Sequence, residues 1–217
     1  MSTIRWTAAA AACAAVMLVA GCKKTADTSV NYSNAINTYF ESRPACLWTD
    51  EVKFPVQADT SDASKTSGYD ALVDQGLLVR TTAEKKVFIV ASKQVTNYDL
   101  SDKGRSAWTA DAQQPGYGNF CYGKRKVSTI DTYTPTSAHP GATTVVTYHY
   151  TLSDTPSWAS APETQTAYPE LRAELTGPKA GSATLTDTNN GWVVASAPGQ
   201  PSSSKKTVTP ADGSIVQ

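Results

Sequence analysis

The stretch Tyr69-Asp70-Ala71-Leu72-Val73-Asp74-Gln75-Gly76-Leu77-Leu78 places the end of a helix beside the start of a strand. Its apolar residues before Gly76 recur at helical spacing, which predicts a short helix over residues 68–75 with one buried face. Gly76 then stands where helices commonly end in a left-handed conformation, which glycine adopts without strain. The apolar residues 77–79 predict a strand that leaves this helix at once.

Further short elements follow this stretch. The apolar run at 86–91 predicts a stronger strand, and residues 98–100 predict another extended piece. Ser101 then caps a helical turn that leads to Trp108. Residues 69–105 thereby resemble a winged-helix module, in which a helix ending "L…GLL" precedes a β-ribbon wing. In that module a closing "Y-x-L-T-x-x-G-R" leads into a helix, as Tyr98-Asp99-Leu100-Ser101-Asp102-Lys103-Gly104-Arg105 does here.

The usual partner of winged-helix proteins is DNA, but the sequence argues against nucleic acid here. The formal net charge is zero, with 19 basic and 19 acidic residues, whereas a DNA-binding surface is basic. Asp70 and Asp74 would face the phosphates from the helix that reads DNA in that family. We therefore expect the topology without the activity, as a unit for packing or protein interaction.

The N-terminus predicts export. Arg5 precedes an uncharged, mostly apolar run from Trp6 to Cys22, and Lys23 ends it. A positive start, an apolar core and small residues at the end are typical of a signal peptide, which we assign to residues 1–21. The alternative is a retained transmembrane helix, for which the run is at the short limit because spanning needs about 20 apolar residues.

The last five residues of this run, Leu18-Val19-Ala20-Gly21-Cys22, resemble the lipobox of bacterial lipoproteins. The resemblance implies cleavage after Gly21, thioether lipidation of Cys22 and acylation of the new amino terminus, with palmitate as an expected acyl group. It also implies the periplasmic face of the outer membrane, because Lys23 rather than Asp follows the cysteine. Residues 22–30 are polar and small, and we expect them to form a tether between the lipid and the fold.

The remaining cysteines predict a disulfide bond. Cys13 leaves with the signal peptide and Cys22 takes the lipid, so Cys46 and Cys121 are left in an oxidising compartment. The alternative is a redox-active pair, but the sequence has no Cys-x-x-Cys motif. We expect a structural Cys46–Cys121 bridge.

The other periodic segments complete an α+β prediction. A helix is expected from Asn31 or Ser33 to Arg43, a loop over 59–67, and a short helix capped by Ser160 with a further turn at 170–175. Antiparallel strands are expected at 124–134 and 143–152. Two more, at 183–187 and 192–196, are joined by Asn189-Asn190-Gly191 in a type I′ turn.

The expected domain organisation is therefore a winged-helix-like N-terminal half followed by a twisted antiparallel β-sheet half. The first half covers residues 31–110 and the second covers 111–197. Residues 198–217 are rich in Pro, Ser, Thr and Lys, and they are expected to form a disordered tail.

Motifs for catalysis or metal binding are not found in the sequence. There is no Gly-x-Ser-x-Gly, Ser-x-x-Lys or His-Glu-x-x-His motif, and no phosphate-binding glycine loop. His139 and His149 have no acidic cluster nearby and no cysteine at zinc spacing. We expect no enzyme activity, no metal site and no cofactor.

One cluster of aromatic residues suggests a partner surface. Tyr117, Phe120 and Tyr122 lie beside the basic residues 124–126 and could contact a protein or a glycan. The alternative is that they pack the disulfide and the junction of the two halves. The functional prediction is a non-catalytic, lipid-anchored envelope protein that binds another protein or a cell-wall component. The alternative is a periplasmic binder of a small or hydrophobic ligand in a pocket between the halves.

Overall fold

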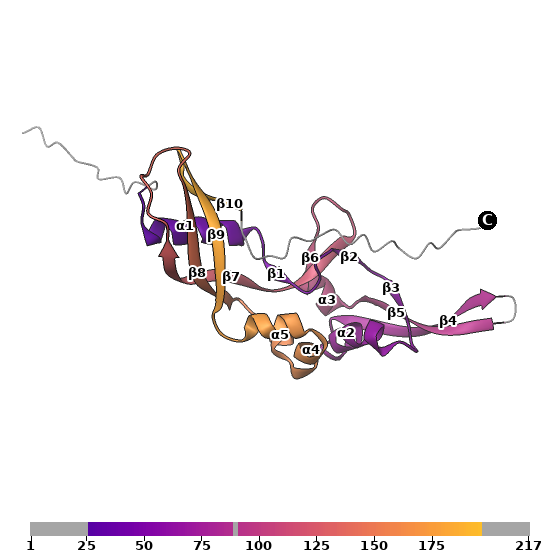
Figure 1. The fold of residues 1–217 in the computed structure, drawn as a ribbon. Helices are drawn as coiled ribbons and strands as arrows, with labels where there is room; N and C mark the ends of the chain where they lie inside the picture. The colour runs from indigo at the N-terminus through magenta and orange to yellow at the C-terminus, as the bar shows by residue number, and fades with distance from the viewer. Residues whose placement is uncertain (1–25, 89–90, 197–217) are drawn as a thin grey trace, which may run out of the picture.

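The computed structural model describes residues 26–88 and 91–196. The predicted signal peptide, the predicted lipidation site Cys22 and the predicted tail at 198–217 lie outside the described residues. The chain is α+β with antiparallel sheets, as expected, and its elements form two lobes (Figure 1). We call them the sheet lobe, built on strands β7 to β10, and the helical lobe, built around helix α2.

The sheet lobe is four antiparallel strands with one helix across them. Strand β7 (Tyr117–Tyr133) pairs with β8 (Thr143–Ser153), β8 with β9 (Lys179–Thr188), and β9 with β10 (Gly191–Ser196). Helix α1 (Ser29–Glu41) packs on one face of this sheet and buries three large side chains there (Figure 1). They are Tyr32, Ile36 and Phe40, which meet Val146, Leu185 and Trp192 from the sheet.

Both expected hairpins of this lobe are confirmed. The structure corrects two details, which are the cap of α1 and the type of the β9–β10 turn. Helix α1 is capped by Thr28 and not by Asn31, because the Thr28 hydroxyl accepts a hydrogen bond from the Asn31 backbone N–H at 3.3 Å. The β9–β10 turn is not type I′. Such a turn needs positive φ at both central residues, which are Asn189 and Asn190 because Thr188 pairs with Gly191, and neither has it. Gly191, which follows them, has a φ of 113°.

The helical lobe contains a three-stranded sheet with α2 (Ala63–Asp74) on one side. Strand β5 (Ala91–Leu100) lies between β3 (Val56–Asp59) and β4 (Leu78–Phe88). Helix α2 begins earlier than expected, because the Asp62 carboxylate caps it by accepting from the Ser64 N–H at 3.1 Å. The loop predicted over 59–67 is therefore wrong in its second half.

The β4–β5 hairpin also corrects the strand predictions. The pieces expected at 77–79 and 86–91 are not two separate strands, because β4 continues from Leu78 to Phe88. The chain has reversed by Ala91, which pairs with Phe88. The apolar run at 86–91 was misleading because it contains the end of one strand and the start of the next.

A clasp of polar contacts holds α3 (Asp102–Ala107) against the end of α2. The Ser101 hydroxyl donates to the Gly76 carbonyl oxygen at 2.6 Å and accepts from the Gly104 N–H at 2.8 Å. The Lys103 ammonium donates to the Gln75 carbonyl oxygen at 2.7 Å. These bonds satisfy carbonyl groups that the helix end leaves without partners, and Gly76 has the expected positive φ of 69°.

Strand β7 connects the two lobes. Its N-terminal part pairs with β1 (Ala45–Cys46), β2 (Val52–Lys53) and β6 (Trp108–Ala110). The Cys46–Cys121 disulfide is present, as expected, and joins directly opposed residues of β1 and β7.

Packing divides the chain differently from the predicted boundary at residue 110. Helix α1 belongs to the sheet lobe, whereas η1 (Ser157–Ser160), α4 (Pro162–Ala167) and α5 (Pro169–Leu175) pack in the helical lobe. Ala161, rather than Ser160, precedes the first residue of α4. Within the described ranges, no helix has the length and apolar character needed to cross a bilayer.

Candidate binding groove

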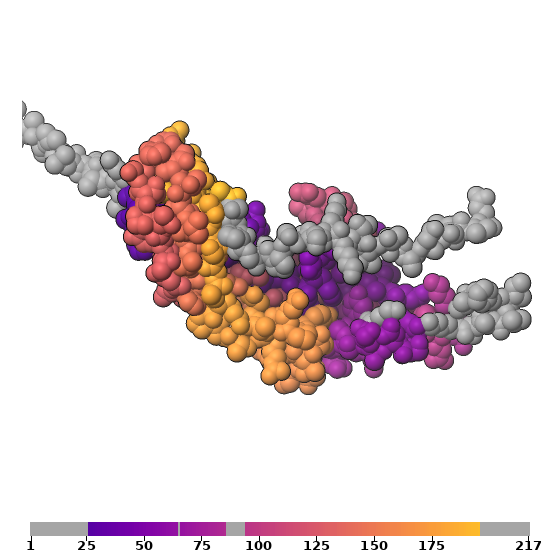
Figure 2. Space-filling view, in the orientation of Figure 1, coloured from indigo at the N-terminus to yellow at the C-terminus, as the bar shows by residue number. Residues whose placement is uncertain are grey.

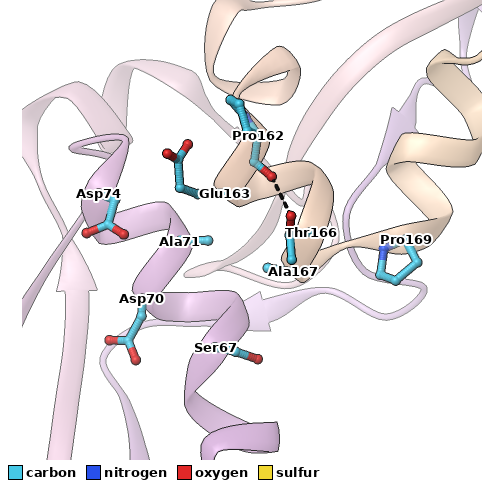
Figure 3. Close-up of a pocket in the computed structure, with 9 residues that line it drawn as sticks. All are labelled: Ser67, Asp70, Ala71, Asp74, Pro162, Glu163, Thr166, Ala167 and Pro169. Atoms are coloured by element: carbon cyan, nitrogen blue, oxygen red, sulfur yellow. Dashed lines mark hydrogen bonds between the residues drawn. The ribbon is translucent and has the colours of Figure 1, made fainter.

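A groove of about 700 Å³ lies where α2 faces α4 and the start of α5 (Figure 3). The two walls come from segments almost a hundred positions apart in the sequence, one from each predicted half. Both walls belong to the helical lobe, and we call this groove the α2–α4 groove. Its lining residues are Ser67, Asp70, Ala71, Asp74, Pro162, Glu163, Thr166, Ala167 and Pro169.

Helix α2 and the α4–α5 link approach closely because position 68 is glycine. A Cβ at Gly68 would lie 2.9 Å from the Tyr168 hydroxyl oxygen. Burial raises the pKa of Tyr168 above its ordinary value. Leu171, on the next turn, is fully buried in the same core. The groove therefore has a packed floor, and its polar residues lie along the rim.

One carboxylate of the groove is already neutralised. Asp70 accepts a hydrogen bond from Arg80 Nη1 at 2.7 Å and one from the Tyr98 hydroxyl at 2.9 Å. Burial, with the Asp70 hydrogen bond as the next cause, raises the pKa of Tyr98 to about 12. Tyr98 therefore stays protonated at neutral pH and keeps donating to Asp70.

The other two carboxylates are not paired. Asp74 on α2 and Glu163 on α4 are exposed, and they lie at the same end of the groove on opposite walls (Figure 3). Neither has a hydrogen bond or an ion pair with a residue of the described ranges, although the charge of Asp74, after Asp70, contributes to the raised pKa of Arg80. Glu163 also lies in the first turn of α4, where the helix dipole stabilises a negative charge.

The remaining lining residues are small or polar. Ala71 and Ala167 leave space between the walls, and the Thr166 hydroxyl is engaged with the Pro162 carbonyl oxygen at 2.8 Å (Figure 3). None of the nine lining residues is aromatic. The groove therefore suits an extended ligand that carries positive charge, more than an apolar molecule.

The predicted aromatic partner surface is corrected by burial. Phe120 is fully buried and Tyr122 nearly so, within the core of the helical lobe. Burial raises the pKa of Tyr122 to about 12. Only Tyr117 is exposed, with Lys53 Nζ 5.7 Å from the centre of its ring. Phe120 and Tyr122 therefore cannot contact a partner. They pack the junction around the Cys46–Cys121 bridge, which is the packing role expected from the sequence as the alternative to a partner surface.

The histidines show one contact that the sequence did not predict. His149 Nδ1 lies 2.7 Å from Asp131 Oδ2 across β7 and β8. His139 is exposed, in the connection between these two strands. Among the residues that the structure describes, no three His, Cys, Asp or Glu side chains gather to hold a metal ion. The Asp131–His149 pairing could have been foreseen only from the exact register of the hairpin, which contains β-bulges.

Comparisons of this chain with protein-family models, with curated proteins and with solved structures found no match.

Proposed function

We propose that the protein is a non-catalytic, lipid-anchored envelope protein whose α2–α4 groove binds a positively charged segment of another envelope protein. The supporting observation is the pair of unpaired carboxylates, Asp74 and Glu163, on opposite walls of an open groove. An extended chain that carries Lys or Arg can lie between α2 and α4 and pair with both. A cell-wall component with amino groups is the other partner that this charge suits.

Removing the two charges tests this binding site. Asp74→Asn together with Glu163→Gln removes two ion pairs of roughly 1 kcal/mol each, so a bound partner should dissociate at least about tenfold more readily. The measurement is affinity co-purification from gently cross-linked envelopes with the lipidated protein tagged after Gln217. Asp50→Asn with Glu51→Gln is the matched control, because it removes the same charge from an exposed site outside the groove.

Comparison of the groove variant with the control variant shows whether the partner binds in the groove. Loss of one stoichiometric partner from the groove variant alone supports the proposal. Equal recovery with the groove and control variants excludes the groove as the binding site, and recovery of wall fragments in place of a protein selects the cell-wall partner.

A small ligand is the second candidate, and the volume of the groove favours it. About 700 Å³ lies within the usual range of small-molecule sites. The lining is open and has no aromatic residue, so a polar amine fits better than a hydrophobic molecule. Native mass spectrometry of protein released gently from envelopes would detect such a ligand, and an unliganded chain that co-purifies with a protein would exclude it.

The anchor is proposed from the lipobox resemblance, and Cys22 is the residue that carries it. A single acyl chain binds membranes weakly, whereas several chains on one residue hold a protein stably. Cys22→Ser should therefore release the folded protein from the membrane fraction into the periplasm, as fractionation and immunoblotting would show. A processed Cys22→Ser chain that stays fully membrane-bound would contradict the anchor. We propose the periplasmic face of the outer membrane as its location, because Lys23 follows the cysteine.

We also propose that α2, the β4–β5 hairpin and α3 form a winged-helix-like unit used for packing and protein contact. The supporting features are the order of these elements and the clasp that Ser101 and Lys103 make on the end of α2. In this arrangement α2 forms one wall of the α2–α4 groove.

A further inference from the structure

The first described residues are already fixed to the sheet lobe. The Ala26 carbonyl oxygen accepts a hydrogen bond from Trp192 Nε1 at 3.2 Å. The Asp27 carboxylate accepts one from the Thr136 backbone N–H at 3.1 Å and another from the Tyr32 hydroxyl. The tether expected over residues 22–30 is therefore shorter than the sequence suggested, because its last part is bound to the fold.

Only Lys23, Lys24 and Thr25 separate Cys22 from Ala26. Four steps along an extended chain span at most about 14 Å. If Cys22 carries lipid, the end of the sheet lobe at Ala26 cannot lie farther than that from the membrane surface.

The parts of the fold at this end carry few charges, and the Asp27 carboxylate among them is already hydrogen-bonded by Thr136 and Tyr32. These parts are the start of α1, the β7–β8 connection that contains Thr136, and the β9–β10 turn, and they lie at the opposite end of the molecule from α2 and β4 (Figure 1). Residues 132–142 and 188–195 contain no Asp, Glu, Lys or Arg. An end with so few carboxylates repels anionic lipids little, and each lysine next to the anchor adds attraction of about 1 kcal/mol.

Exposed apolar side chains gather at the same end. Four of the six large hydrophobic residues that are exposed in the described ranges lie here. They are Val30 (66% exposed), Tyr133 (37%), Val145 (48%) and Val193 (46%). Val30 lies in the first turn of α1, and the others lie at or near strand ends beside the β7–β8 connection or the β9–β10 turn. Apolar side chains around a short tether favour contact with the interfacial region of a bilayer.

We propose that this end of the sheet lobe, comprising the β7–β8 connection, the β9–β10 turn and these four side chains, is a docking surface for the lipid headgroups of the membrane that holds Cys22. The proposal rests on the proposed lipid anchor. The strands of the sheet lobe then lead away from the membrane, and an 11-residue strand such as β8 spans about 36 Å. The helical lobe and its groove are thereby presented to partners away from the bilayer (Figure 2).

Hydrogen exchange on vesicles tests the docking surface. The lipidated protein in phosphatidylethanolamine–phosphatidylglycerol vesicles is compared with soluble Cys22→Ser protein. We expect severalfold slower exchange over residues 134–142 and 188–191 on vesicles, and no change in the loop at 111–116 of the other lobe. Unchanged exchange at 134–142 in an acylated, vesicle-bound chain would overturn the docking surface and leave the anchor intact.

A variant with a longer tether tests the lipid anchor and the docking surface independently. A Gly/Ser linker of about 20 residues inserted between Thr25 and Ala26 gives a reach of roughly 25 Å, so the acylated chain should stay on vesicles while the protection is lost. Protection that persists with the long linker also supports the surface, because its apolar side chains would then hold it at the bilayer unaided. A mature chain that mass spectrometry shows to be unacylated and soluble would overturn the anchor, and this inference with it.

Discussion

Replacing Cys46 and Cys121 together by alanine should lower the free energy of unfolding by about 4 kcal/mol. The bridge closes a loop with a sequence separation of 75 residues, and a cross-link of that length removes chain entropy of this size from the unfolded state. The segment after Cys46 is also hydrogen-bonded to β7, because Asn119 accepts from the Trp48 N–H at 3.2 Å and donates to its carbonyl oxygen at 2.7 Å. We therefore expect the variant to fold with the same strand pairing and lower stability.

Urea unfolding of the soluble Cys22→Ser form measures this difference directly. The double variant should unfold at a lower midpoint, and reducing agent should bring the Cys22→Ser parent to the same midpoint as the variant. Ser106→Ala, at an exposed position of α3, is a control that should shift stability by less than about 0.5 kcal/mol. A double variant as stable as its parent would show that the bridge does not stabilise the fold.

Local signals predicted much of this fold. Gly76 lies just beyond the end of α2, and the Asn-Gly dipeptide marked the β9–β10 hairpin. Each acts through its own backbone preference, so a single sequence is enough to read it. The turn type could not be read in this way, because the register at Gly191 depends on the pairing of both strands.

The candidate site could not be predicted, because long-range packing assembles it. Asp74 and Glu163 carry no local pattern, and they meet only because α2 packs on α4. The burial of two aromatic residues could not be predicted for the same reason. Phe120 and Tyr122 sit beside basic residues in the sequence, yet β7 turns both into the core.

Asp187 in the sheet lobe is another residue whose burial could not be predicted from the sequence. It was predicted to lie in a strand and does so, but alternation along β9 puts its carboxylate on the inward face shared with Leu185. It is almost fully buried, and neither carboxylate oxygen has a hydrogen bond to any residue that the structure describes. Sequence patterns place carboxylates outside because burying one without a partner is costly, so a residue of this kind is found only from the structure.

Gly104→Ala should strongly destabilise the helical lobe. A Cβ at position 104 would overlap the carbonyl oxygen of Leu77, which is a backbone atom and cannot rotate away. To relieve the overlap, α3 must move from the end of α2, and the bonds of Ser101 and Lys103 to the Gly76 and Gln75 carbonyl groups are then stretched or lost. Overpacking of about 1–3 kcal/mol with two hydrogen bonds of about 1 kcal/mol each gives a loss of at least about 3 kcal/mol.

A thermal melt of the soluble form checks this prediction. A loss of that size lowers the midpoint of a chain of this length by about 10 °C. Lys103→Met is the comparison variant, because it removes only the bond to Gln75 and should cost about 1 kcal/mol. If Gly104→Ala were no more damaging than Lys103→Met, the close approach of α3 to Leu77 would not be required for the fold. The glycine in the closing motif would then reflect local helix geometry alone, and the physical basis for the winged-helix-like unit would be reduced to the order of its elements.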